Sequence, residues 1–402
     1  MTRRSPSAAI IGGGVGGIAA ALTLARVGYE VKVYEQSGNL AEVGAGIQIA
    51  PNASRILDRL DLTPALERVA VVADLFEFRR WADGRLVSAT PLGDPIQRKF
   101  GFGYYQVHRA DLLKLLFEAL PGGCVEVGRR CIDLIESNNR VELRFADGGS
   151  ASADVVVGAD GIHSMTRDKF LARGPARFTG NVAFRALVPF EKIADLGLKR
   201  TITMHMGPGG HFIHYFVSAG RMLNVVLLRD ETDWTRESWT DRGEIDEVRA
   251  GCRGWNETVV SIIGAMDVAL KWALFDRMPL SQWSFGRVTL LGDACHPMLP
   301  YVAQGASQAI EDAGALAACL ANSLADDPSS ALRRYEALRL PRVSAVQAMA
   351  RENAGRFHLP DGPEQCARDA AMASRFGLTP AIDWLYGYDA EAIDAPPNPP
   401  PI

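Results

Sequence analysis

The sequence has 402 residues, of which 48% are hydrophobic and 22% are charged, which is enough for two globular domains with large apolar cores. Its 43 Lys and Arg and 47 Asp and Glu give a formal net charge of −4, and the basic residues are spread along the chain, which excludes a nucleic-acid-binding surface. No stretch approaches the roughly 18 apolar residues of a membrane helix, so the composition also argues against a membrane protein.

The first chemical motif lies at the front of the chain. An apolar run at residues 8–11 leads directly into GGGVGG, in which Gly12, Gly14 and Gly17 fit G-x-G-x-x-G, and Glu35 closes the next strand-like segment. Such glycines let the backbone approach a pyrophosphate, the following helix offers its N–H groups, and the acid accepts hydrogen bonds from a ribose. The pattern predicts a buried strand, rather than an export signal, and a Rossmann-like unit that binds an adenine dinucleotide.

The middle of the chain changes to short alternating strands. VAFRALVPF, TITMHM, HFIHYFV and LNVVLL follow one another between residues 182 and 230, which predicts an antiparallel sheet that forms one wall of a small-molecule pocket. HFIHYFV places His211, Ile213, Tyr215 and Val217 on one face. Because His211 and Tyr215 lie about 13 Å apart along a flat strand, each would contact a different part of a ligand.

From spacing alone, His211 and Tyr215 could equally be a backbone-bound histidine and a core tyrosine. Five of the six other histidines are interpreted as structural, and His296 is expected to bond to local backbone. These are His108, His163, His205, His214 and His296. The six cysteines have no C-x-x-C spacing, which predicts neither a zinc site nor a redox dithiol and favours a reducing cytoplasm.

Late in the chain, SFGRVTLLGDACHP reads as a strand that ends at Gly292-Asp293, and helical spacing of apolar residues begins near Gly305. An acid after a strand can bind the sugar-like part of a long cofactor, and a helix tip can face a group that becomes anionic. A flavin fits both features, with Asp293 on the ribityl hydroxyls and the N–H groups of Gly305 and Ala306 on the ring edge.

A third segment, VVVGADGIHSMTR at residues 155–167, again has a strand followed by an Asp-Gly turn. The three motifs, GxGxxG, ADGxxSxxR and GDAxHxxxPxxxQGxxxxxEDA, together resemble the group A flavoprotein monooxygenases, the aromatic hydroxylases of the p-hydroxybenzoate hydroxylase fold. GAGIQIAPN, HRADLL, MLPYVAQGA and WLYGYD are similar to salicylate hydroxylases, 3-hydroxybenzoate 6-hydroxylases and 6-hydroxynicotinate 3-monooxygenases.

The resemblance implies an α/β fold with a discontinuous Rossmann-like FAD-binding domain, an antiparallel substrate domain and C-terminal helices. The expected boundaries are 1–75, 97–175 and 275–345 for the FAD-binding domain, 76–96 and 176–274 for the substrate domain, and 346–402 for the C-terminal helical segment and tail. The composition of the ending, APPNPPPI, predicts a mobile tail.

The resemblance also assigns residues. Asp160 would serve both FAD and the reduced nicotinamide, the backbone near Cys131 would flank the adenine, and Gln48 would lie beside the flavin ring. The implied FAD contacts are Gly12, Gly14, Gly16, Gly17, Glu35, Gln48, Arg109, Cys131, Asp160, Asp293, Gly305 and Ala306. The implied substrate contacts are Gln48, His211, Tyr215 and Tyr301, with His211 and Tyr215 as the catalytic residues.

The implied activity is hydroxylation of a hydroxylated aromatic or heteroaromatic acid through a flavin hydroperoxide, with NADH or NADPH and O₂ as co-substrates. His211 would act as base or proton relay, since a histidine near its ordinary pKa of about 6.5 can take a proton at neutral pH, and Tyr215 would orient the substrate. With no second G-x-G-x-x-G, the nicotinamide is expected to dock transiently. No metal is expected, and a homodimer is one expected assembly.

Other interpretations remain. A 6-hydroxynicotinate-type decarboxylating hydroxylase is the alternative, although that subgroup carries histidines where this sequence has Gln48 and Tyr301. A nicotinamide-dependent dehydrogenase without flavin would give a colourless protein. A non-catalytic flavin sensor would be yellow but would show no oxygen uptake stimulated by a phenolic acid.

Overall fold

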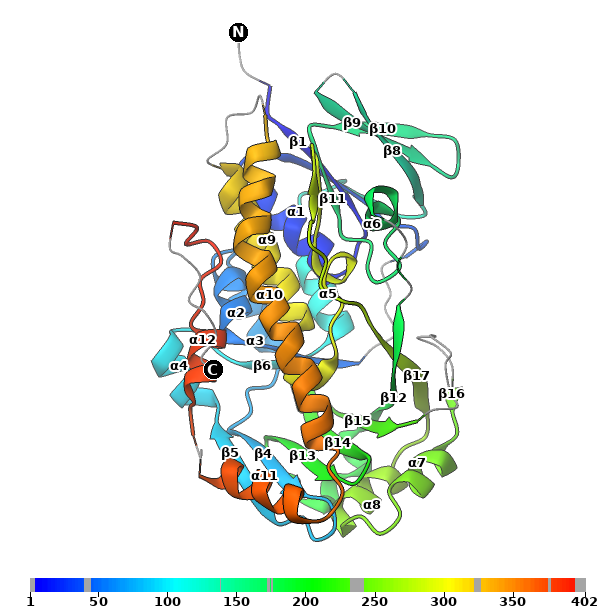
Figure 1. The fold of residues 1–402 in the computed structure, drawn as a ribbon, viewed down its shortest axis with the longest axis vertical. Coiled ribbons are helices and arrows are strands. Elements are labelled where there is room, and N and C mark those ends of the chain that lie inside the picture. Colours follow the sequence, from blue (N-terminus) through cyan, green and yellow to red (C-terminus); the bar gives the residue numbers. More distant parts are fainter. Residues whose placement is uncertain are drawn as a thin grey trace.

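The structure is a computed structural model that describes residues 4–39, 45–137, 139–171, 174, 176–231, 242–321, 327–374 and 377–394. Within those ranges the chain forms two large sheets at opposite ends of an elongated molecule, joined along one side by a long helix (Figure 1). The tail at 395–402, predicted to be mobile, lies outside the described residues.

The first large sheet contains the glycine-rich turn. Its strand order is β18 (Ser284–Phe285), β19 (Val288–Leu290), β11 (Val155–Gly158), β1 (Ser7–Ile11), β2 (Glu30–Tyr34) and β7 (Val125–Glu126). All neighbours are parallel except β18 and β19. Because β1 is central and buried on both faces, it is apolar throughout: Ala8 and Ile10 join the core beneath the helices, and Ala9 and Ile11 join the core on the other face.

Helices cover one face of this sheet, and a small sheet covers the other. The helices of this part are α1 (Val15–Arg26), α2 (Pro51–Asp58), α3 (Thr63–Val69), α5 (Arg109–Glu118), α6 (Met165–Phe170) and α9 (Gly305–Ala321). The smaller sheets are β8 (Cys131–Ser137), β9 (Arg140–Phe145) and β10 (Ser150–Ala153), and the pair β3 (Gly46–Ile49) and β6 (Tyr105–His108). The expected Rossmann-like part is therefore confirmed.

The second large sheet has the order β16 (Arg242–Gly243), β17 (Ala269–Asp276), β12 (Arg177–Pro189), β15 (Met222–Asp230), β14 (Gly210–Val217), β13 (Thr201–Gly207), β4 (Leu75–Arg80) and β5 (Leu86–Pro91). It is antiparallel, as predicted, except that β4 and β13 pair in parallel. A parallel pair needs a long connection, and here the chain between β5 and β12 passes through the FAD-binding part. Helices α4 (Gly93–Phe100), α7 (Ile245–Gly251) and α8 (Glu257–Gly264) accompany this sheet.

Strand β14 alternates as its sequence predicts. Ile213, Tyr215 and Val217 pack in the core that also contains Tyr301, while Phe212 and Phe216 belong to the core on the opposite face. His214 follows the second set: its ring stacks on His205, which bonds to Asn256. The two histidines are therefore structural, as predicted.

These two histidines make stability depend on pH. Burial lowers the pKa of His205 to about 4 and that of His214 to about 3, so the unfolded chain binds more protons than the folded protein below about pH 6.5. Stability is therefore complete above that pH and falls as the solution is acidified. We expect the free energy of unfolding to drop by about 3 kcal/mol per histidine between about pH 6.5 and pH 4.

Urea unfolding at several pH values between about 7 and 5 tests this expectation. His214→Phe, which removes one of the two buried bases, should flatten the slope. An unfolding free energy that stays level on acidification, or an equally steep slope in the variant, would contradict it.

The C-terminal helices link the two ends. Helix α10 (Ser329–Phe357) runs down one side of the molecule from the parallel sheet to the mixed sheet (Figure 1), so the predicted boundary after residue 345 falls inside it. Helix α11 (Pro363–Ala373) packs on β5, and α12 (Pro380–Tyr386) packs near α2. Within the described ranges, no helix is both long and apolar enough to span a bilayer.

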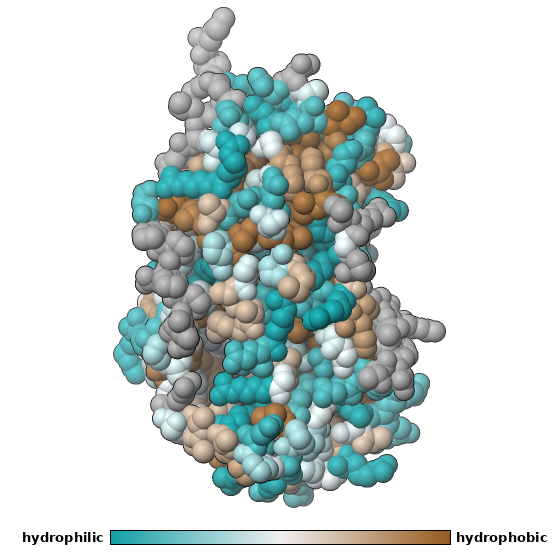
Figure 2. All heavy atoms as spheres, viewed as in Figure 1, coloured by the Kyte–Doolittle hydropathy of each residue, from teal (hydrophilic) through white to brown (hydrophobic). Residues whose placement is uncertain are grey.

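Polar and apolar residues are intermixed over the face of the molecule seen in Figure 2.

Buried charges fasten α9 to α10. Arg339 binds Glu311 and Asp312, and Arg342 binds Glu311, with all four side chains almost fully buried. Burial alone would raise the pKa of both acids, but the two arginines and His296 outweigh it and hold the values below their ordinary range. Charged side chains buried at this depth require such pairing.

Candidate active site

A cavity of about 500 Å³ lies between the two large sheets. Its walls come from the glycine-rich turn, β3, β12, β14, the loop between β19 and α9, and the end of α10. It brings together most of the predicted site residues: Gly14, Gly16, Gln48, Arg109, His211, Tyr215, Asp293, Tyr301, Gly305 and Ala306. Gly12, Gly17, Glu35, Cys131 and Asp160 do not line it.

The glycine-rich turn has the shape that a pyrophosphate requires. A Cβ on Gly12 would lie 2.3 Å from the Ala159 carbonyl oxygen, and one on Gly17 would lie 2.0 Å from the Gly12 carbonyl oxygen. Gly14, by contrast, faces open space at the start of α1, whose first turn contains no acidic residue. Gly12 and Gly17 are thus needed for close backbone packing, and Gly14 leaves backbone N–H groups accessible to an anion.

Three predicted FAD contacts lie around this turn. Glu35 follows β2 and accepts hydrogen bonds from the N–H groups of Gly13 and Ser37, each at 2.7 Å. Cys131 is buried at the start of β8, and burial raises the pKa of its thiol to about 11. Asp160 uses its carboxylate to hold the start of α6, accepting from the Ser164 hydroxyl and the Thr166 N–H. Their contacts with FAD stay predictions.

Asp293 is placed on a short 3-10 turn, η4 (Gly292–Ala294), directly after β19. Its side chain is exposed and lines the cavity. Burial raises its pKa, against the opposing effects of His296 and Arg109. A carboxylate whose surroundings disfavour its charged form needs hydrogen-bond donors, and the ribityl hydroxyls of a flavin would supply them.

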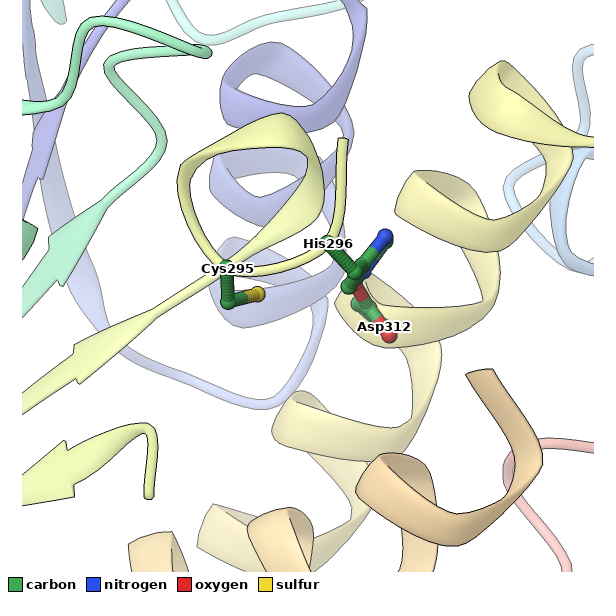
Figure 3. A group of neighbouring side chains, drawn as sticks. All are labelled: Cys295, His296 and Asp312. Carbon is green, nitrogen blue, oxygen red and sulfur yellow. The ribbon is translucent and has the colours of Figure 1, made fainter. Parts of the chain in front are cut away.

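The turn that carries Asp293 is braced by buried side chains, and Figure 3 shows Cys295, His296 and Asp312 among them. His296 bonds through Nε2 to Oδ2 of Asp312, and Arg339 holds the other oxygen of that carboxylate at 2.8 Å. The expectation that His296 bonds to local backbone is therefore wrong: its partner lies on the facing helix α9, which sequence spacing could not show. The Gly292 N–H also donates to Asp312, at 3.1 Å.

Cys295, His296 and Asp312 lie close enough together to suggest a metal site. The chemistry fits a hydrogen-bonded brace better. Burial raises the pKa of Cys295 well above its ordinary value, its thiol donates to the Gly292 carbonyl oxygen, and Arg339 already neutralises Asp312. A thiolate ligand would have to form against all of these contacts.

His211 and Tyr301 also line the cavity. Their rings lie 5.5 Å apart, and Nδ1 of His211 is 2.9 Å from Nε2 of His358. Burial, and then His358, lower the pKa of His211 well below its ordinary value, so His211 is neutral at neutral pH. The Tyr301 hydroxyl is buried without a hydrogen-bond partner among the described residues, which marks it for a polar group of a bound molecule.

Tyr215 and Gln48 form a second polar group in the cavity. Oε1 of Gln48 accepts a hydrogen bond from the Tyr104 hydroxyl, and burial raises the pKa of Tyr215 to about 12. Tyr215 also packs so closely on Gly46 that a Cβ there would lie 2.8 Å from its ring. The ring of Tyr215 is therefore held in place by backbone that only glycine allows.

Arg185 is a cavity residue that the sequence analysis did not identify. It lies on β12 with its guanidinium 4.4 Å from the ring centre of Trp272, and its buried Nε has no hydrogen-bond partner among the described residues. Burial lowers its pKa to about 10, so it is still charged at neutral pH. A single arginine in the apolar strand VAFRALVPF was the available signal.

Together, a parallel sheet with a glycine-rich turn, a carboxylate facing the cavity and the polar groups of His211 and Tyr301 define a flavin-dependent oxidoreductase with an internal substrate pocket. A family model described as FAD binding domain matches residues 6–350. The chain belongs to this family, and FAD is its cofactor.

Similar proteins and solved structures agree with this assignment to an FAD-binding family. The chain is 45% identical to the 3-amino-4-hydroxybenzoate 2-monooxygenase PtmB3 of Streptomyces platensis, with 98% of each chain covered. It is 36% identical to the 6-hydroxynicotinate 3-monooxygenase of Pseudomonas fluorescens, over 87% of this chain and 91% of that one. A salicylate hydroxylase in complex with its substrate superposes with a TM-score of 0.81 at 30% identity, over 97% of each chain. The prediction of an FAD-dependent aromatic monooxygenase is confirmed.

Proposed function

We propose that the protein hydroxylates the ring of a benzoate that carries hydroxyl and amino groups, with 3-amino-4-hydroxybenzoate as the substrate to test first. The single observation that carries this proposal is the cavity itself. Arg185, whose Nε has no hydrogen-bond partner among the described residues, shares this chamber with Asp293 and with the polar groups of His211 and Tyr301. The 45% identity to a monooxygenase of 3-amino-4-hydroxybenzoate supports the choice of substrate.

In this proposal FAD, once bound and reduced, activates O₂ for transfer to the ring. The chain's own residues bind the cofactor and the substrate, accept the substrate proton and exclude water. Asp293, Gly14 and the start of α9 hold the cofactor, Arg185 binds the substrate carboxylate, and Tyr215 and Tyr301 orient the ring. His211 accepts the proton of the hydroxyl or amino group that pushes electrons into the ring, and the apolar cavity walls exclude water.

Arg185 provides a direct test of the carboxylate site. Charged hydrogen bonds contribute about 1.5–3 kcal/mol, so we expect Arg185→Met to lower kcat/KM for 3-amino-4-hydroxybenzoate by about 10–150-fold. The loss should lie mainly in KM, while flavin content is retained. The native protein should also prefer the acid over the corresponding neutral benzamide, and the variant should lose that preference.

Arg177→Met is the matched control, because Arg177 lies on the same strand but is exposed. It should leave both KM and the preference for the acid unchanged. If Arg185→Met instead loses FAD and keeps its substrate preference, Arg185 serves the cofactor rather than the substrate.

The function is tested by a panel of aromatic acids. Stimulated NAD(P)H oxidation and O₂ uptake, followed by product analysis, should single out 3-amino-4-hydroxybenzoate against salicylate, 3-hydroxybenzoate and 6-hydroxynicotinate. Stimulation and product formation with 6-hydroxynicotinate alone would overturn the proposed substrate. Gln48 and Tyr301, in place of the histidines of that subgroup, argue against this outcome.

The proposal also includes the reductant, the cellular compartment and the assembly of the protein. NADH or NADPH supplies the electrons by transient docking, and the protein works in the reducing cytoplasm. The cysteines support a reducing compartment, since all six are free thiols and five are buried. A homodimer is also proposed, and sedimentation tests it.

A further inference from the structure

A row of three polar side chains leads from the cavity to the surface. His211, on β14, is 2% exposed and lines the cavity. Its Nδ1 lies 2.9 Å from Nε2 of His358, at the end of α10, and Nδ1 of His358 lies 2.6 Å from Oδ1 of Asp230, at the end of β15. The side chain of His358 is 4% exposed, whereas that of Asp230 is 54% exposed.

The backbone fixes this row. The Gly209 N–H donates to the His358 carbonyl oxygen at 3.0 Å, and the Asp230 N–H donates to the Gly209 carbonyl oxygen at 2.8 Å. Asn181 also donates to Oδ1 of Asp230, at 2.8 Å. The hairpin turn between β13 and β14 therefore holds the end of α10 against the end of β15, so the three side chains keep their order.

Ionised Asp230 dictates where the protons lie. Since the carboxylate only accepts, Nδ1 of His358 donates to it and Nε2 of His358 must accept. Nδ1 of His211 then donates to His358, and Nε2 of His211 is left with a lone pair. The row thus sets the tautomer in which His211 can take a proton from a substrate.

We propose that His211, His358 and Asp230 form a proton path that connects the substrate cavity with solvent. The inference rests on the proposed function. The hydroxyl or amino group of the substrate gives its proton to Nε2 of His211, the proton on Nδ1 of His211 passes to Nε2 of His358, and the proton on Nδ1 of His358 passes to Asp230 and then to water. The same path in reverse returns a proton to the product and restores both tautomers.

The side chains around His211 and His358 favour transfer of a proton along the path over its retention on one histidine. Among the described residues, the titratable side chains that face His211 are Tyr301, from η5 (Pro300–Val302), and His358. Those that face His358 are His211, Tyr301 and Asp230. Burial destabilises the doubly protonated, charged form of His211. A proton that His211 accepts is therefore passed on to His358 rather than held. Asp230 can hand the proton to water because it is exposed.

The test uses the FAD-loaded full chain with 3-amino-4-hydroxybenzoate. Asp230→Asn and His358→Gln should each slow the hydroxylation step, measured by single-turnover mixing of the reduced enzyme with O₂, by about 10²-fold, the lower end of what a positioned proton-transfer group contributes. Both should show a larger solvent deuterium isotope effect and a shifted pH profile. Asp361→Asn, close to His358 in sequence but bonded to Arg80 and Trp81 instead, should behave as the native protein.

Buffer rescue separates a proton path from a structural contact. In Asp230→Asn the exposed end of the path is lost, so a small diffusible base such as imidazole at high concentration should restore the rate. In His358→Gln the buried middle member is lost, and the same base should not restore it. Unchanged melting temperature and flavin content in Asp230→Asn show that the fold is intact.

Two results overturn the proposal. One is a native rate and native pH profile in both variants while the native protein hydroxylates its substrate. The other is a slow Asp230→Asn variant that no buffer base rescues. If the native protein itself hydroxylates none of the aromatic acids tested, the proposed function has failed and the path loses the substrate on which it rests; that result is distinct from both.

Discussion

We expect His211→Ala to purify with its flavin and to be reduced by NAD(P)H at a native rate, yet to form product about 10²–10⁴-fold more slowly. His211 lines the cavity from β14 and contacts Tyr301 and His358, and it has no part in the turn that carries Asp293. Its loss should therefore remove the proton acceptor without disturbing the cofactor site. The electrons delivered to the flavin should then appear as hydrogen peroxide. Product yield per NAD(P)H consumed, together with peroxide, is the measurement.

His214→Gln is the control for this experiment. His214 lies three residues further along β14 but on the opposite face, where it stacks on His205. That variant should keep its coupling of NAD(P)H oxidation to product formation. Full product yield in His211→Ala would remove His211 from the reaction.

Loss of the carboxylate at Asp293 is the second large expected effect. Asp293→Ala should bind FAD about 10–150-fold more weakly, because charged hydrogen bonds of about 1.5–3 kcal/mol are lost. The variant should therefore emerge pale and recover absorbance only with excess FAD. Fluorescence quenching during titration of the apoprotein with FAD gives the dissociation constant.

Asp293→Asn separates charge from hydrogen bonding, since the amide keeps the size and one acceptor oxygen. It should fall between the native protein and Asp293→Ala. Because Asp293 stands on the turn braced by His296 and Asp312, the melting temperature must be compared as well. A native dissociation constant for FAD in Asp293→Ala would contradict the role assigned to this residue.

The sequence predicts the local turns of the fold better than the contacts between distant elements. The glycine-rich turn, Asp293 and the start of α9 are local: each lies within a few residues of a strand or helix end, so short motifs identify them. The alternation of β14 likewise places His211 and Tyr215 on one face. Local periodicity is a property of the chain itself and needs no tertiary contact.

What the sequence could not predict depends on pairing between distant elements. His358 meets His211 across 147 residues of chain and Asp230 across 128, and no spacing rule connects them. The partner of His296 was missed for the same reason, as was the parallel pairing of β4 with β13. Arg185 lies in the apolar strand VAFRALVPF, but only the positions of its neighbours show that its Nε has no hydrogen-bond partner among the described residues.

The central claim is that one cavity holds a flavin at Asp293 and an aromatic acid between Arg185 and His211, so that oxygen passes directly to the ring. Turnover of 3-amino-4-hydroxybenzoate under ¹⁸O₂, with mass spectrometry of the product, tests this claim most directly. We predict one ring hydroxyl that contains a single ¹⁸O atom. NAD(P)H consumption that yields only labelled hydrogen peroxide, with the aromatic acid recovered unchanged, would contradict it.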